Sequence, residues 1–167
     1  MAGKLARAFA HLGTGTGAVR RHFDDAAMKR IRDAIAAAER GHAGEVRFAV
    51  EAALPLGKLR QHADARSRAI EVFAHLRVWD TEANTGVLLY LLWADRAIEI
   101  VADRGIAARV PASDWEAVCA QIVEGLRAGR AADAVVEGIA RIGGLLRAAL
   151  PAQDATPDEL PDEPAVL

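Results

Sequence analysis

The sequence predicts an α/β protein with a three-layer α/β/α fold, in which helices flank a small mixed sheet. Two observations lead to this prediction. Candidate elements follow one another in the order helix, strand, helix, strand, strand, helix, helix. Residues 87–93 form the most apolar run of the chain and show no alternation, which is typical of a strand covered on both faces. A central sheet between two helical layers is the most economical way to bury such a strand.

Length and composition agree with one globular domain that carries short tails. The chain has 167 residues, of which 52% are hydrophobic, 26% are charged and 5% are aromatic. The net charge of −2 provides no whole-chain basic field for nucleic acid. A single cysteine excludes an internal disulfide, and no apolar run is long enough to cross a bilayer. We therefore expect a cytoplasmic protein without a transmembrane segment.

Charge divides the chain into three parts. Residues 1–21 form a basic arm with a short amphipathic helix, because apolar side chains recur there at helical spacing. Residues 22–150 are the expected α/β domain. Residues 151–167 are rich in proline and contain five acidic residues and no basic residue, which predicts a disordered acidic tail. The basic arm is expected to make at most weak contact with an anionic membrane surface or with a partner.

The first helix of the domain is expected to begin after Asp24. Asp24 is a good N-cap, and Phe23 before it is placed to pack on Met28 as a hydrophobic staple. Either Gly41 or Gly44 ends the helix. The predicted buried stripe comprises Met28, Ile31, Ile35 and Ala38.

Residues 45–51 alternate polar and apolar side chains, which predicts the first strand. A loop with Pro55 follows over residues 52–57, and residues 58–77 are predicted to form a second helix. Because this helix connects strand 45–51 to strand 87–93, the two strands should be parallel. The inward positions expected on the helix are Ala63, Ala69, Ile70, Phe73 and Leu76.

The remaining elements are a hairpin and two helices. Ala94 and Asp95 are predicted to form a two-residue turn into a strand over residues 96–102, which makes the sheet mixed. Residues 113–116 match a capping box that opens the next helix. A final helix over residues 131–150 ends before Pro151, which cannot continue it. The buried positions expected on the first of these helices are Val118, Cys119, Ile122 and Leu126.

Oxygen-bearing side chains cluster in the polar loop 79–86, just before the most buried strand. Antiparallel pairing of the hairpin should place the end of its second strand beside this loop, and functional groups in open α/β sheets gather at strand ends. We therefore expect one edge of the sheet to collect a set of oxygen ligands of the kind that Ca²⁺ or Mg²⁺ prefers. The predicted metal ligands are Asp80, Glu82, Asn84, Asp103 and Glu51.

The same residues have a structural alternative, which spacing alone favours because no EF-hand pattern is present. In this alternative, Asp80 and Asn84 satisfy the loop backbone, and Asp103 pairs with Arg104 or Arg96. No catalytic motif accompanies the set. The histidines lack metal-ligand spacing, the two serines lie outside any nucleophile elbow, and Cys119 lies on an apolar helix stripe, which favours an inert thiol.

The segment RVWDTEANTGVLLYL, residues 77–91, resembles the TPM domain family. The likeness continues through residues 94–106 and Trp115, and residues 44–50 are similar to the family's first strand. It covers residues 22–150 and is nearest to short bacterial members, which lack the signal peptide and membrane helix of their larger relatives. Those relatives include proteins of the thylakoid lumen and of photosystem II repair.

The resemblance implies a three-layer fold with a mixed sheet, and acidic loop residues that bind divalent cations. It also implies an association with membrane or envelope systems, and some plant relatives have been assigned acid phosphatase activity. Two functions follow as expectations. The first is a non-catalytic interaction or scaffold module that binds a divalent cation and supports a membrane-associated protein partner. The alternative is a divalent-metal-dependent phosphatase that acts on phosphate monoesters.

Overall fold

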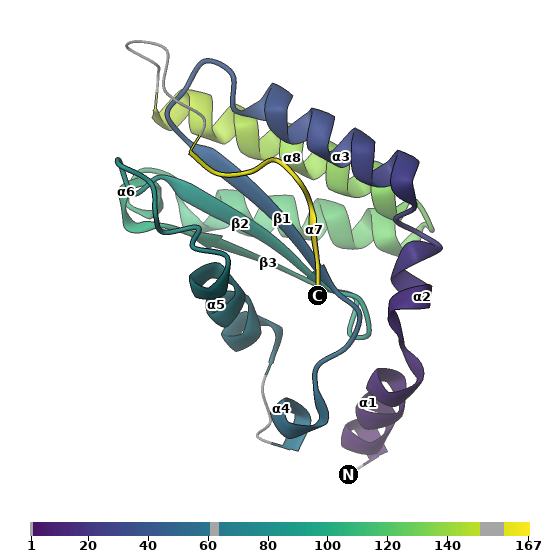
Figure 1. The fold of residues 1–167 in the computed structure, drawn as a ribbon. Coiled ribbons are helices and arrows are strands. Elements are labelled where there is room, and N and C mark those ends of the chain that lie inside the picture. Colours follow the sequence, from purple (N-terminus) through teal and green to yellow (C-terminus); the bar gives the residue numbers. More distant parts are fainter. Residues whose placement is uncertain (1, 61–63, 151–158) are drawn as a thin grey trace.

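A mixed sheet lies at the centre of the computed structural model, which describes residues 2–60, 64–150 and 159–167 (Figure 1). In this part of the chain the sheet has four strands in the order β3-β2-β1-β4. The strands are β1 (Glu45–Glu51), β2 (Gly86–Leu92), β3 (Ala97–Ala102) and β4 (Ala165–Val166). Helices cover both faces of the sheet, which confirms the predicted three-layer α/β/α fold.

The pairing of β1 with β2 is parallel, as predicted, and runs from Glu45 opposite Gly86 to Glu51 opposite Leu92. The pairing of β2 with β3 is antiparallel and ends at Leu92 opposite Ala97. The hairpin connection is therefore residues 93–96, and the prediction of a two-residue turn at Ala94 and Asp95 was wrong. Arg96 has a φ of 51°, and its guanidinium lies 3.7 Å from the centre of the Trp93 ring, so this contact holds the longer turn.

Three helices pack on one face of β1 and β2: α3 (Asp25–Ala38), α7 (Ala112–Arg127) and α8 (Ala131–Ala149). The predicted N-cap of α3 is confirmed, because the Asp24 carboxylate accepts the N–H of Ala27 at 2.8 Å. The predicted capping box at residues 113–116 was wrong. Helix α7 already begins at Ala112, after Pro111, whose fixed φ suits the entry to a helix and whose carbonyl accepts the Asp114 N–H.

The opposite face is covered by α5 (Ala65–His75), with α4 (Leu56–Arg60) beside it. The prediction of one helix over residues 58–77 was wrong. Asp64 and Ser67 form a capping box, which starts α5 anew. This register directs Ala65, Ala69 and Val72 to the sheet and leaves Ile70, predicted to face inward, 50% exposed. Ala63 lies outside the described residues.

The end of the chain is ordered as part of the sheet, so the predicted disorder was wrong for Ala165–Val166. These residues form β4 and pair in parallel with Ala49 and Val50 at the outer edge of β1. Leu160 is buried in the core cluster that α5 and the sheet form together. An unpaired strand edge and an apolar site together stabilise this segment despite its proline and acidic content. Residues 151–158 lie outside the described residues.

The basic arm contains two helices, α1 (Ala2–Gly13), which was predicted, and α2 (Thr16–Arg20). Helix α1 is fixed to the β2–β3 hairpin by Asp95, whose carboxylate binds the Arg7 guanidinium at 2.8 Å and His11 Nε2 at 2.9 Å. The other ring nitrogen of His11 accepts the Leu54 N–H at 2.9 Å. In the part of the chain that the structure describes, no helix has the length and apolar content required to cross a membrane.

Gly86 begins β2 where the chain passes the backbone of the loop before it. A Cβ at Gly86 would lie 1.9 Å from the Val78 carbonyl oxygen, whereas a Cβ at Gly144, on the exposed side of α8, would meet nothing within 4 Å. We expect Gly86→Ala to lower the free energy of unfolding by about 3 kcal/mol. Gly144→Ala, the matched control, should raise it by about 0.5–1 kcal/mol through helix propensity. Urea unfolding measures both changes, and equal effects of the two substitutions would contradict the close approach at Gly86.

Candidate functional site

The structure divides the predicted ligand set between two ends of the sheet. The loop that carries Asp80, Glu82 and Asn84 leads into Gly86, beside the start of β1, and Asp103 donates its N–H to the Gly86 carbonyl at 2.9 Å. Glu51, in contrast, ends β1 and lies opposite Leu92. The expectation that Glu51 joins the other four was wrong, because parallel pairing aligns the loop with the amino end of β1.

Around Asp103 the structural alternative is partly realised. Asp103 Oδ1 accepts the backbone N–H of Arg104 at 2.7 Å and caps α6 (Arg104–Ala107). The Arg104 guanidinium instead donates to Asn84 Oδ1 at 3.1 Å, and Asn84 adopts a φ of 54°. Asp103 Oδ2 is buried and has no hydrogen-bond partner among the described residues.

Asp80 and Glu82 are exposed in the same loop. The backbone N–H of Glu82 donates to the Glu159 carboxylate at 2.7 Å. Across the described ranges, no group of three or more histidine, cysteine, aspartate or glutamate side chains is arranged to hold a metal ion. The five predicted ligands therefore do not form one coordination set as the structure places them.

Glu51 belongs to a buried network that joins α5 to the sheet. Its carboxylate accepts two hydrogen bonds from the Arg68 guanidinium, at 2.8 and 3.0 Å, and one from the Tyr90 hydroxyl at 2.6 Å. Burial raises the pKa of Tyr90, so its hydroxyl keeps its proton and donates a hydrogen bond to the Glu51 carboxylate. These contacts compensate the buried charge of Glu51 and give it a structural role.

A second buried charged region, which the sequence analysis missed, lies at the start of β1. Arg47 is 8% exposed and donates from Nη1 to the Pro161 carbonyl. Glu45 accepts the Leu160 N–H at 3.3 Å. A signal for this region was present in the sequence, since Glu45, Arg47 and Glu51 occupy alternate positions of a strand and so share one face.

Three acidic side chains meet beside Arg47, and we call Glu39, Glu45 and Asp162 the acidic junction. Glu39 follows α3 and accepts the Val46 N–H at 2.7 Å. Burial raises the pKa of Glu39 to about 9, and the neighbouring Glu45 and Asp162 add to the rise. Glu39 is therefore protonated at neutral pH and shares a hydrogen bond with Asp162.

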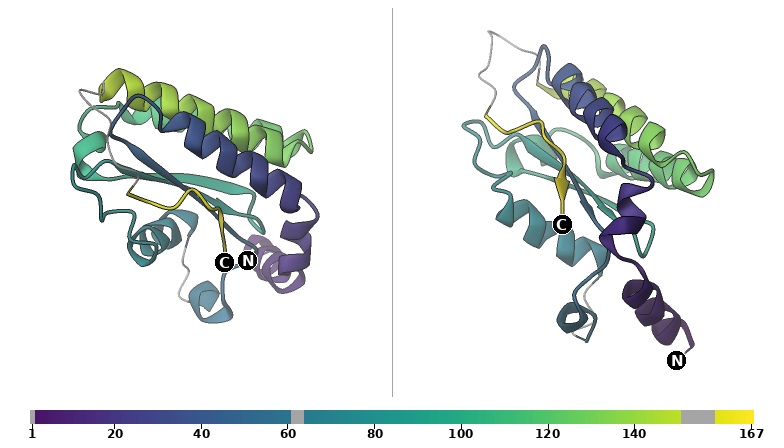
Figure 2. Two further views of the ribbon diagram at one scale, coloured as in Figure 1. Left: turned by 45° about the horizontal axis from the view of Figure 1, so that its top comes forward. Right: turned by 45° about the vertical axis from the view of Figure 1, so that its right-hand side comes forward.

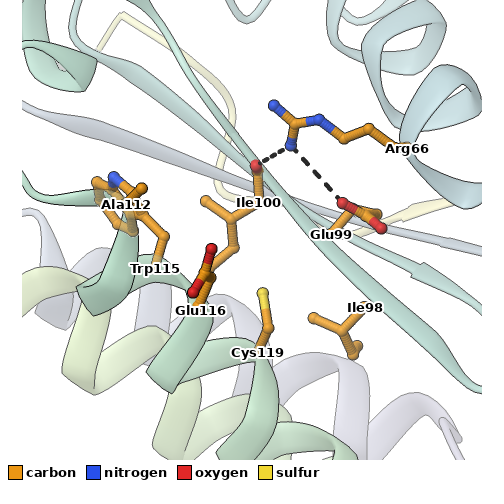
Figure 3. Close-up of a pocket in the computed structure, with 8 residues that line it drawn as sticks. All are labelled: Arg66, Ile98, Glu99, Ile100, Ala112, Trp115, Glu116 and Cys119. Atoms are coloured by element: carbon orange, nitrogen blue, oxygen red, sulfur yellow. Dashed lines mark hydrogen bonds and ion pairs between the residues drawn. The ribbon is translucent and has the colours of Figure 1, made fainter.

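A hollow of about 460 Å³ lies beside β3, between α5 and α7 (Figure 3), and we call it the β3 groove. Apolar side chains of β3 and α7 form much of its wall, and charged side chains stand around them. The Arg66 guanidinium donates to the Ile100 carbonyl and lies 3.7 Å from the Glu99 carboxylate. The lining residues are Arg66, Ile98, Glu99, Ile100, Ala112, Trp115, Glu116 and Cys119.

Cys119 is the nucleophilic side chain of the β3 groove, but its environment keeps it unreactive. Burial raises the pKa of the thiol to about 11, and the nearby Glu99 charge adds to the rise. The thiol is therefore protonated at neutral pH, and only the thiolate is a strong nucleophile. The raised pKa of the thiol agrees with the predicted inert cysteine. The lining of the β3 groove is suited to apolar groups that lie between charged side chains.

The fold is that of an α/β domain with a mixed sheet, and the β3 groove lies beside one outer strand of this sheet. The family model of the TPM domain matches residues 20–145, so the chain belongs to the TPM domain family.

Two solved structures extend this result. The NMR structure of the BA42 protein from the psychrophilic bacterium Bizionia argentinensis is 29% identical, with a TM-score of 0.75 over 84% of this chain and 92% of that chain. The N-terminal domain of a P. gingivalis protein is 17% identical and shows the same fold, with a TM-score of 0.63 over 81% and 83% of the two chains. A search of curated proteins found no significant match. The likeness to thylakoid-lumen relatives stays a prediction.

The acidic junction predicts how stability depends on pH. Because the folded-state pKa of Glu39 lies above its ordinary value of 4.5, its contribution to stability is fully present below pH 4.5. It decreases as the pH rises through about 9, with a slope of at most about 1.4 kcal/mol per pH unit. Glu39→Gln, which keeps an acceptor for the Val46 N–H, should be more stable than the wild type by a margin that grows over this range.

Urea unfolding between pH 5 and 9 measures this margin. Glu124→Gln is the matched control, because Glu124 is exposed and pairs with Arg127 on the surface of α7. The control should leave the pH profile of the wild type unchanged. A Glu39→Gln profile parallel to that of the wild type would contradict a shared proton in the acidic junction.

Proposed function

We propose that this TPM domain is a non-catalytic interaction module that binds a protein partner in the β3 groove. The observation that carries the proposal is the position of the groove, which combines apolar side chains and a charged rim with an outer strand of the sheet. Interfaces concentrate their binding energy in central aromatic or apolar anchors that a polar rim surrounds. Trp115, which lines the groove, supplies such an anchor.

The backbone of β3 adds a directional element to the groove. Asp103 pairs with Gly86 through its N–H, and alternation along an antiparallel ladder then turns the N–H and C=O groups of Ile98 and Ile100 away from β2. Arg66 already binds the Ile100 carbonyl from this side. An outer strand with outward backbone groups favours a partner that docks an extended segment.

Site-specific photo-cross-linking in cells tests the proposal, with two alanines of α7 as matched positions. Ala112 lines the groove, whereas Ala120 is exposed on the same helix outside it. We expect a defined cross-linked protein from position 112 and at least about tenfold less from position 120, because only position 112 faces the proposed partner. The same products at both positions, or none at position 112, would contradict the proposed groove.

A divalent-cation site is a second proposal. The observation that favours it is the buried Oδ2 of Asp103, which has no hydrogen-bond partner within the described part of the chain. Backbone carbonyls and a single carboxylate can contribute to a Ca²⁺ site. Adding Ca²⁺ or Mg²⁺ should shift NMR signals of residues 80–86 and 103–105 only. Asp103→Asn should abolish the shifts, whereas Asp33→Asn, on the exposed side of α3, should retain them. Uniform small shifts across the chain would rule the site out.

The alternative function, a divalent-metal-dependent phosphatase acting on phosphate monoesters, depends on this cation site. Metal-dependent hydrolysis of an aryl phosphate by the wild type, and its loss in Asp103→Asn, would favour the phosphatase over the interaction module.

Membrane-surface contact through the arm belongs to the same set of proposals. Helix α1 presents Phe9 at 70% and Leu12 at 63% exposure, and apolar side chains of this kind can insert at the surface of an anionic bilayer. The contact would bring the β3 groove towards a membrane-associated partner.

A further inference from the structure

Residues 159–167, which we call the strap, extend along the outer edge of β1 at the side of the sheet opposite β3. Figures 1 and 2 show this segment beside β1 in all three views. Its last residues form β4, and the Leu167 N–H donates to the Val50 carbonyl at 2.9 Å. The strap therefore binds β1 in the manner of an added strand.

Leu160 anchors the other end of the strap. Its side chain is 6% exposed and packs in the core cluster that contains Tyr90 and Leu88. Its N–H donates to Glu45, and the next carbonyl, of Pro161, accepts from Arg47. An apolar anchor followed by main-chain hydrogen bonds is the way in which sheet edges recognise extended peptides.

One charge of the strap, that of Asp162, matches this surface poorly, because it adds to the rise in the pKa of Glu39. The strap carries Asp162 and Glu163, while the surface beneath it presents Glu39 and Glu45 together with Arg47. Arg47 Nε is buried without a hydrogen-bond partner among the described residues. The strap thus pairs with the surface through its apolar anchor and main-chain hydrogen bonds, but it leaves the Arg47 Nε–H unused and helps to keep Glu39 protonated.

We propose that the surface beneath the strap is a docking site for an extended peptide of a partner protein, and that the strap occupies it until the partner displaces it. This site lies at the other edge of the sheet from the β3 groove and does not depend on the function proposed for that groove. The strap defines the chemistry of the partner peptide, which combines a leucine anchor with an extended segment that pairs in parallel with β1.

The acidic junction defines one further property of the partner. A peptide with asparagine in place of Asp162 keeps a hydrogen-bonding group for Glu39 and removes the carboxylate that helps to raise the pKa of Glu39. A carboxylate in the position of Glu163 still attracts Arg47, because Glu163 is the foremost charge acting on that guanidinium. The preferred partner sequence is therefore leucine-anchored and less acidic than the strap.

The test uses the full chain and a labelled nine-residue peptide with the sequence of residues 159–167, whose binding is measured by fluorescence anisotropy. A segment tethered by a short linker competes at an effective concentration of about 1 mM. If the peptide binds with a Kd of about 0.1 mM, the resident strap weakens its binding about tenfold. Two variants release the strap: Leu160→Ser removes the anchor, and Leu167→Pro removes the N–H that binds Val50.

We expect both released variants to bind the peptide about tenfold more tightly than the wild type, with NMR shifts at Val50 and neighbouring residues of β1. Replacing aspartate by asparagine in the peptide should tighten binding, and replacing its first leucine, which corresponds to Leu160, by serine should abolish it. Failure of both folded variants to bind, or equal binding by variants and wild type, would overturn the proposal. A dimer formed by strap exchange, detected by sedimentation, would also overturn it by making a second copy the occupant.

Discussion

The parallel pairing of β1 with β2 is the constraint on which the rest of the structure depends. Both strands are buried along their full length, so helices must cover both faces of the sheet. In the hairpin, β3 pairs with the edge of β2 that β1 leaves free. The three strands together then have two outer edges. One is β3, beside a groove, and the other is β1, to which the chain adds β4. Both proposed binding surfaces arise from these edges, because the faces of the sheet are occupied.

Burial of β1 also determines the electrostatics of the domain, because Glu45, Arg47 and Glu51 all lie on one buried face of it. Buried charges are tolerated only when partners compensate their desolvation. At the carboxyl end of β1, Arg68 on α5 provides this compensation for Glu51. At the amino end, Glu45 and Arg47 bind backbone groups of the strap. The charged residues at the carboxyl end of β1 thus pair with a helix, whereas those at its amino end pair with the nine-residue strap.

Local patterns in the sequence predicted β1 and the start of α3, because alternation and capping act over a few residues, and the helical connection between β1 and β2 predicted their parallel direction. The errors arose where distant contacts decide. Proline and acidic residues favour disorder in residues 151–167, but the open edge of β1 and the apolar site for Leu160 order the segment from Glu159 onward. Four of the five predicted ligands lie at one end of the sheet, whereas strand direction separates Glu51 from them. The role of Arg47 was missed. Alternation shows which face of β1 carries Arg47, but it does not show that the strap covers this face.

Native-state hydrogen exchange tests most directly the claim that the strap is a displaceable partner of a stable sheet. The Leu167 amide, which binds the Val50 carbonyl, reports on the strap, and the Leu89 amide reports on the buried centre of β2. We expect Leu167 to exchange by local opening, with a free energy at least about 2 kcal/mol below that of Leu89 and little dependence on denaturant. Exchange of both amides with the same free energy and the same denaturant dependence would show that the strap opens only when the domain unfolds, and would contradict a displaceable strap.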